Sequence, residues 1–199
     1  VEEFRSADGG LGYAEAKAGE PFVRVGVGVV KRIDEKPFTF STTYDILDPG
    51  KWQVKKGRDR IRFTHELHAP TGYAYQYTKT VRFSGAQMVI EHQLRNTGKR
   101  RIQTAQYNHN FFVMDGQPSG PDTWVKFPFE LKETRKFNPE LAAVKGSEVR
   151  YLKELQTGQG IIAEFTGFGP TASDYDVRLE NRKAKTGVRI RGDRPLSKV

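Results

Sequence analysis

Apolar and polar positions alternate over short blocks of this chain, which is the pattern of half-buried β-strands. Aromatic and β-branched residues recur in these blocks, and Gly, Pro, Asp and Asn separate them. The alternation is clearest over residues 61–68, where every second side chain is apolar or a histidine. The pattern predicts an all-β fold, with strands over residues 22–30, 38–46, 61–68, 73–83, 88–94, 102–113, 124–131, 161–165, 175–179 and 188–190.

Turn sequences between these blocks indicate how the predicted strands are connected. Residues 84–86 read Ser-Gly-Ala and residues 96–99 read Asn-Thr-Gly-Lys, so the centre of the chain is predicted to be an antiparallel meander ending in the strand 102–113. Asp-Pro-Gly at 48–50 predicts another turn. Asn-Pro-Glu at 138–140 is typical of a helix start, which predicts at most one short helix, over residues 141–144.

Gly26 and Gly28 flank Val27 inside the first predicted strand. A nucleotide-binding loop needs a third glycine at the right spacing and a following helix, and both are missing. Glycine inside a strand more often marks a bulge or a close approach of another backbone segment. We therefore expect a structural role for this glycine pair.

The composition narrows the range of possible protein classes further. The chain has 199 residues, enough for one domain, and we treat residues 1–199 as a single domain. It has no cysteine, which excludes disulfides, thiolate metal sites and cysteine nucleophiles. No apolar run is long enough to span a membrane, so no membrane partner is expected. The chain starts with valine, so we expect a processed, trimmed or partial sequence, and its compartment stays open.

The formal net charge is +9, which makes polyanions conceivable partners. The basic residues, however, are spread over three clusters, in residues 55–62, 99–101 and 182–194. In half-exposed strands such residues usually form the solvated face. The aromatic residues alternate inward while the basic clusters fall on turns and outer faces, so a nucleic-acid partner is not expected.

Residues 106–112 carry the most distinctive chemistry of the chain, a histidine between two asparagines and among aromatic rings. In a strand, Tyr107, His109 and Phe111 share one face. Rings can cover the apolar face of a sugar while amides hold its hydroxyls, and histidine can give or take a proton near neutral pH. The local pattern is compatible both with a sugar site at these residues and with a histidine packed in the core.

The pair His65 and His68 resembles a zinc motif only in part. The helical zinc motif needs two histidines four residues apart on one helical face, whereas these are three apart in a predicted strand and point to opposite sides. We expect His65 to be packed, His68 to lie at the surface, and no metal site. His92, on an apolar strand face, is expected to be a satisfied core residue.

The motifs at residues 75–79 (Tyr-Gln-Tyr-Thr-Lys), 94–98 (Leu-Arg-Asn-Thr-Gly) and 107–112 (Tyr-Asn-His-Asn-Phe-Phe) follow one another in this order. Together they resemble the galactose mutarotase-like, or aldose 1-epimerase, superfamily, from about residue 22 to the end. The resemblance implies a large antiparallel β-sandwich with a concave sugar cleft. It implies anomer interconversion without a cofactor, in which a histidine protonates the ring oxygen and a glutamate takes the anomeric proton.

On this resemblance His109 matches the catalytic histidine, and Asp176 matches an aspartate that binds sugar hydroxyls. Tyr107, Asn108 and Asn110 are the expected neighbours of a bound sugar or sugar phosphate. An earlier histidine of the family has no match here, and Lys31, Arg32 or Trp52 are the candidates for its binding role. Of these, we predict that Arg32 binds the substrate.

The Pro-Gly-Glu segment that bears the family's glutamate is also missing. Either the chain stops before the C-terminal strands that carry it, or another carboxylate such as Glu164 or Glu180 is the base. A histidine without its base would favour a non-catalytic carbohydrate-binding module. A basic nucleic-acid-binding β domain is the third hypothesis, and it predicts strongly salt-dependent binding to single strands.

Overall fold

The computed structural model describes residues 2–6, 9–39 and 41–199, and this part of the chain is almost entirely β. Every strand pair in it is antiparallel. Its one helical segment is the 3-10 turn η1 (Ala172–Asp174). The prediction of an all-β antiparallel fold with one short helix at most is confirmed. Contacts divide the chain into two compact units, Val1–Asn110 and Phe111–Val199, and a single domain over 1–199 stays a prediction.

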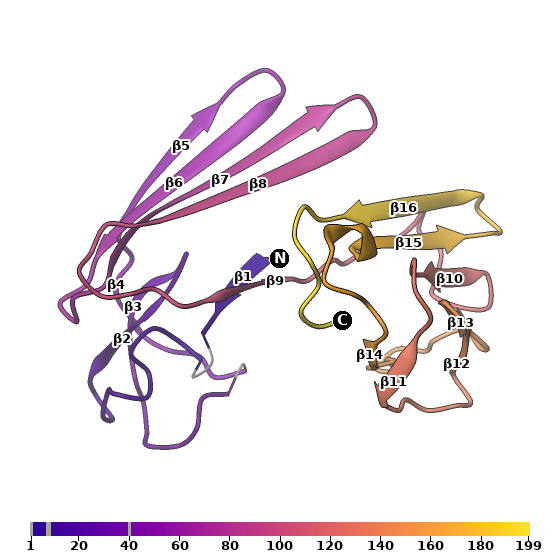
Figure 1. The fold of residues 1–199 in the computed structure, drawn as a ribbon, viewed down its shortest axis with the longest axis horizontal. Coiled ribbons are helices and arrows are strands. Elements are labelled where there is room, and N and C mark those ends of the chain that lie inside the picture. Colours follow the sequence, from indigo (N-terminus) through magenta and orange to yellow (C-terminus); the bar gives the residue numbers. More distant parts are fainter. Residues whose placement is uncertain (1, 7–8, 40) are drawn as a thin grey trace. The chain divides into compact units, whose positions relative to one another are not determined.

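The first unit contains three sheets (Figure 1). The largest has the strand order β5-β6-β7-β8, a second has the order β2-β3-β4, and β1 pairs with β9. The bounds are β1 (Glu2–Arg5), β2 (Pro21–Arg24), β3 (Gly28–Lys31), β4 (Ile46–Asp48), β5 (Lys51–Lys56), β6 (Arg60–His68), β7 (Ala74–Ser84), β8 (Gln87–Asn96) and β9 (Ala105–Asn108).

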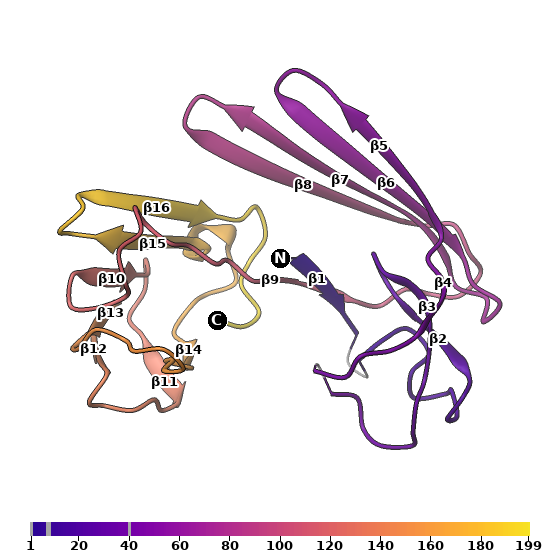
Figure 2. The same ribbon diagram turned by 180° about the vertical axis from the view of Figure 1, so that it is seen from behind.

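Two of these sheets share a core. Val23 and Val29 of the three-stranded sheet pack with Leu67, Tyr75 and Tyr77 of the four-stranded sheet. The alternation along β6 and β7 places these side chains on one face, as the period of two predicts. The first unit is therefore organised as two antiparallel sheets packed face to face, with the long strands β5–β8 extending beyond the shared core (Figure 2).

The predicted strand 22–30 is in fact a hairpin. The amide of Val27 donates to the carbonyl of Arg24 (3.0 Å), and Gly26 has φ +80°, so the chain turns between β2 and β3. The expected close backbone approach is found at Gly28, where an added Cβ would lie 2.2 Å from the carbonyl oxygen of Asp48. The predicted turn at 48–50 is confirmed, because the amide of Gly50 donates to the Asp48 carboxylate (2.8 Å).

Two other strand predictions need correction. Of residues 38–46, only Ile46 lies in a strand, and residue 40 is outside the described part. Phe38 and Tyr44 instead stack on each other (5.8 Å between ring centroids), so their rings pack as loop residues. The segment 102–113 forms a strand only at β9, which pairs with β1 rather than continuing the meander beside β8.

His65 is the buried centre of a hydrogen-bonded chain in the first unit, with none of its surface exposed. Because a carbonyl can only accept, Nε2–H donates to the carbonyl of Pro49 (2.9 Å). Nδ1 is then unprotonated and accepts from the hydroxyl of Tyr75 (3.1 Å), which itself accepts from the amide of Gly26 (3.0 Å). The predictions of a packed His65 and an exposed His68 are confirmed.

This burial gives a pH prediction. Desolvation lowers the pKa of His65, and this outweighs the Pro49 carbonyl and the charge of Asp48, which raise it. The unfolded chain takes up the proton first as the pH falls, so the first unit should lose stability as the pH falls through and below about 6.5. Denaturant unfolding followed by Trp52 fluorescence in a Trp124→Phe background measures this.

The matched variants are His65→Gln and His68→Gln. The substitution at the exposed His68 should keep the pH slope of the unfolding free energy, whereas the substitution at His65 should flatten it. An unchanged slope in His65→Gln would show that another group causes the dependence.

The second unit is built on a five-stranded sheet with the order β12-β13-β10-β15-β16, beside a small β11-β14 sheet. Its core consists of Ala142, Val149 and Phe165 with partly buried apolar neighbours. The bounds are β10 (Thr123–Lys126), β11 (Lys132–Arg135), β12 (Ala142–Lys145), β13 (Glu148–Tyr151), β14 (Glu164–Thr166), β15 (Asp176–Asn181) and β16 (Thr186–Arg191).

The helix expected over residues 141–144 is wrong. The carboxamide of Asn138 accepts from the amide of Glu140 (2.9 Å), which closes a turn instead of capping a helix. Residues 142–145 then form β12, which pairs with β13 through a turn at Gly146 (φ +59°). Ala142 and Val149 enter the core from this hairpin, so packing decides its structure.

Candidate functional site

The sequence-predicted histidine lies just beyond β9, at the end of a two-stranded ribbon. Tyr107 and His109 point to the same side, as predicted, with ring centroids 4.3 Å apart and ring planes at 67°. The Tyr107 hydroxyl and His109 Nε2 are 2.5 Å apart, within hydrogen-bond distance. His109 is half-buried and Tyr107 is 39% exposed, so the pair borders solvent rather than a closed core.

Strand β1 supplies charged groups to this ribbon. The register places Glu3 opposite Tyr107, and the Arg5 guanidinium carbon lies 4.2 Å from the centroid of the Tyr107 ring. The Glu3 carboxylate is held by Arg24 (2.6 Å) and Arg5 (3.6 Å). The sequence offered no signal for this pairing, because the two strands are a hundred residues apart along the chain.

The other residues of the motif have different surroundings. Asn108 is half-buried and accepts a hydrogen bond from the carboxamide of Gln106 (3.1 Å), whereas Asn110 is exposed. Phe111 and Phe112 begin the second unit, and both rings are exposed. Within the first unit the structure therefore brings together Tyr107 and His109.

Asp176 is already engaged by a neighbouring strand. Two nitrogens of Arg189 bind its two carboxylate oxygens, one pair at 2.7 Å. This guanidinium holds the pKa of the Asp176 carboxyl below its usual value. Asp176 belongs to the second unit, while His109 belongs to the first.

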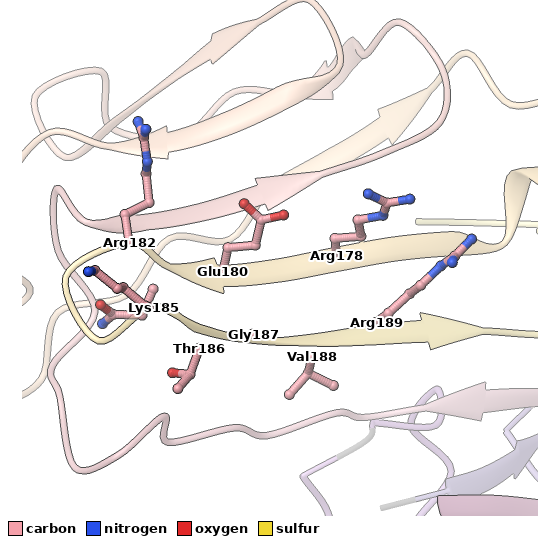
Figure 3. Close-up of a pocket in the computed structure, with 9 residues that line it drawn as sticks. Arg178, Glu180, Arg182, Lys185, Thr186, Gly187, Val188 and Arg189 are labelled. Carbon is pink, nitrogen blue, oxygen red and sulfur yellow. The ribbon is translucent and has the colours of Figure 1, made fainter. Parts of the chain in front are cut away.

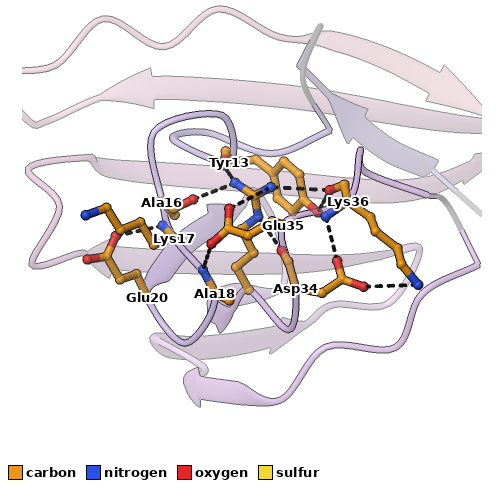
Figure 4. Close-up of polar contacts among 9 residues, drawn as sticks. Tyr13, Ala16, Lys17, Ala18, Glu20, Asp34, Glu35 and Lys36 are labelled. Carbon is orange, nitrogen blue, oxygen red and sulfur yellow. Dashed lines mark hydrogen bonds and ion pairs between the residues drawn. The ribbon is translucent and has the colours of Figure 1, made fainter.

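Arg32 has a structural role, and its expected sugar contact stays a prediction. Its side chain is buried, with the residue only 7% exposed, and its guanidinium lies 4.5 Å from the centroid of the Tyr13 ring. The guanidinium donates to four backbone carbonyls, those of Tyr13 (3.1 Å), Ala16 (2.5 Å), Asp34 (2.7 Å) and Lys36 (3.3 Å). Figure 4 shows the two loops that bear these residues gathered around one point. Arg32 thus ties the loop before β2 to the loop after β3.

The two alternatives to Arg32 differ from each other. Lys31 forms an ion pair with Asp45 (3.0 Å). Trp52, in contrast, is 46% exposed and lies flat on the buried imidazole of His65, with centroids 4.2 Å apart and planes at 4°. Because His65 is fixed by hydrogen bonds, Trp52 is an exposed ring on a rigid support.

The carboxylates considered for the base both carry a lysine partner in the second unit. Lys198 lies 2.9 Å from Glu164, and Lys126 lies 2.9 Å from Glu180. The described residues contain no group of three or more His, Asp or Glu side chains that could hold a metal ion. They also contain no helix long and apolar enough to cross a membrane.

Comparison with models of protein families, with curated proteins and with solved structures finds no match for this chain. The resemblance to the galactose mutarotase-like superfamily therefore depends on the order of its short motifs alone. Its functional consequences are taken up below as a proposal.

Proposed function

We propose that this chain is a carbohydrate-active protein of the aldose 1-epimerase type, with His109 as its proton donor. The observation that supports this most is the hydrogen-bonded pair of Tyr107 and His109 at the solvent-bordering end of β9. An imidazole beside an exposed aromatic ring suits an aldose, because the ring can cover the C–H face while the imidazole reaches an oxygen. The substrate would be a free aldose or its phosphate, and no cofactor is needed.

The hydrogen bond suggests how the proton is held. In the protonated imidazole both ring nitrogens carry a hydrogen, so Nε2–H donates to the Tyr107 hydroxyl and Nδ1–H is the proton available to the substrate. Transfer of the Nδ1 proton from this imidazolium to the ring oxygen, with loss of the anomeric hydroxyl proton to a base, opens the ring and leaves a neutral imidazole. Rotation about the C1–C2 bond and closure then give the other anomer. Glu164 and Glu180, the carboxylates considered for the base, lie in the second unit, and each is paired with a lysine there.

The experiment is exchange NMR on the anomeric protons of several aldoses, with the chain added to buffer. We expect the α and β anomers of at least one aldose to interconvert faster with protein than without it. Background rates for every aldose would contradict catalysis by this chain.

A non-catalytic carbohydrate-binding module is the second candidate, and the exposed Trp52 ring favours it. Aromatic stacking contributes much of the affinity of such sites, so Trp52→Ala should abolish glycan binding in a glycan array while His109→Ala should leave most of it. Trp124→Ala is the matched control, because guanidinium groups already cover that ring. Equal losses in both tryptophan variants would contradict a Trp52 platform, and thermal melts check that both variants fold.

A further inference from the structure

One face of the five-stranded sheet is strongly charged. Alternate residues of these strands enter the core, and the register aligns the others on the opposite face. The charged face carries three carboxylates, those of Glu148, Asp176 and Glu180. It also carries seven cations: Lys126, Lys145, Arg150, Arg178, Arg182, Arg189 and Arg191.

A hollow lies along the β15–β16 hairpin at Gly187, and residues from both faces of the strands line it. Gly187 lies opposite Glu180 in the β15–β16 pair and has no side chain, so it forms a floor between longer neighbours. The open space is about 500 Å³. Besides Gly187 it is lined by the cations Arg178, Arg182, Lys185 and Arg189, by the carboxylate of Glu180, and by Asn181, Thr186 and Val188 from the opposite face. Figure 3 shows Arg178 and Arg182 rising on the same side of the strands as Glu180. We call this space the Gly187 hollow.

Much of the positive charge at the hollow is not cancelled. Each carboxylate of the face has its own cation: Lys126 pairs with Glu180 (2.9 Å), Arg150 with Glu148 (2.5 Å), and Arg189 with Asp176. No ion pair is found for Arg178, Arg182 or Lys185 within the described residues. Within this described part of the chain, three cations at the hollow thus form no ion pair, although the charge of Arg178 contributes to the lowered pKa of Asp176.

The tryptophan of this face favours a compact anion over a stacked base. The Arg150 and Arg182 guanidinium carbons lie 3.9 Å and 4.3 Å from the centroid of the Trp124 ring. A nucleic-acid base would have to displace one of these groups to stack there. The same contact holds the fork of Arg182 at the hollow, which reduces the entropy lost when an anion binds.

Lys185 adds a second indication. It has φ +55° in the turn between β15 and β16, a conformation that glycine adopts with much less strain. The chain therefore has a lysine where the backbone favours glycine, and that lysine lines the hollow. A non-glycine residue in such a backbone conformation is a reason to look for function.

We propose that the Gly187 hollow binds the phosphate group of a phosphorylated small molecule. Arg178 and Arg182 would donate paired N–H groups to its oxygens, and Lys185 would add a point charge. The site requires neither His109 nor catalysis, and it shares only Glu180, a candidate for the base, with the proposed sugar chemistry.

Calorimetric titration with inorganic pyrophosphate at fixed ionic strength tests the site. The double variant Arg178→Gln/Arg182→Gln should bind at least about tenfold more weakly than the wild type, because two charge-assisted donors are lost. The matched control, Arg58→Gln/Arg62→Gln, removes the same charge from an exposed part of the first unit and should bind normally. An equal loss in both, or no binding by the wild type at millimolar pyrophosphate, would overturn the proposal.

The variant Lys185→Gly tests pyrophosphate binding separately from folding. Removing the strained side chain should leave the melting temperature unchanged or higher, while pyrophosphate affinity falls. Unchanged affinity in a folded Lys185→Gly variant would contradict the role of Lys185. A single-stranded oligonucleotide that binds more tightly than pyrophosphate, and quenches Trp124 fluorescence in a Trp52→Phe background, would replace the small-molecule proposal with a nucleic-acid one.

Discussion

His109→Ala is expected to slow catalysed anomer exchange by about 10²- to 10⁴-fold, the usual contribution of one general acid–base group. The loss should fall on the chemical step, because the substitution removes the proton donor but leaves the Tyr107 ring in place. Exchange NMR at saturating aldose, with wild type and variant compared in the same buffer, measures the effect.

Two further variants make this result specific. His68→Ala removes an exposed histidine of β6 in the same unit and should keep the wild-type rate. His109→Gln can keep a hydrogen bond to Tyr107 but cannot act as a general acid at neutral pH, so it should be as slow as His109→Ala. Full activity in His109→Gln would mean that the side chain only positions Tyr107, and the proton donor would have to be sought elsewhere.

The parts of the fold that follow from local chemistry could be read from the sequence. The turns at 48–50 and 96–98 each close with an amide donating to the preceding Asp or Asn side chain (2.8 and 2.9 Å), as their residue types predict. The hairpin of β7 and β8 follows from alternation on both sides of a glycine turn. Such features need only neighbours along the chain.

The parts that depend on distant partners could not be read in this way. Strand β9 continues the alternation of the meander, yet it pairs with β1, which precedes it by a hundred residues. Residues 138–144 carry helix-start chemistry, yet the packing of Ala142 beside Val149 and Phe165 places a strand there. Local preference is a weak determinant when burial of apolar side chains opposes it.

The candidate site likewise contains some features that the local sequence predicts and others that depend on distant partners. The shared side of Tyr107 and His109 follows from the period of two, and the structure confirms it. The ion pair of Asp176 with Arg189 was within reach of sequence reasoning, since a short turn joins their strands. The role of Arg32 was not, because its four acceptors come from loops whose packing the local pattern does not determine.

Because Arg32 joins two loops through these hydrogen bonds, replacing it should have a large effect on stability. Arg32→Lys should lower the free energy of unfolding of the first unit by about 2–4 kcal/mol, since an ammonium has three donors for four carbonyls and buried acceptors left unpaired cost about 1–3 kcal/mol each. Trp52 lies in the first unit, so urea unfolding followed by its fluorescence in a Trp124→Phe background reports on this unit.

Arg62→Lys is the matched control, because Arg62 is exposed on β6 and its replacement should change the unfolding free energy by less than about 0.5 kcal/mol. If Arg32 held a sugar instead of the two loops, Arg32→Lys would keep its stability and lose glycan affinity. The four carbonyl contacts predict the reverse, namely a destabilised first unit that, where folded, binds the same ligands as the wild type. The ratio of these two losses therefore distinguishes a loop clamp from a binding residue.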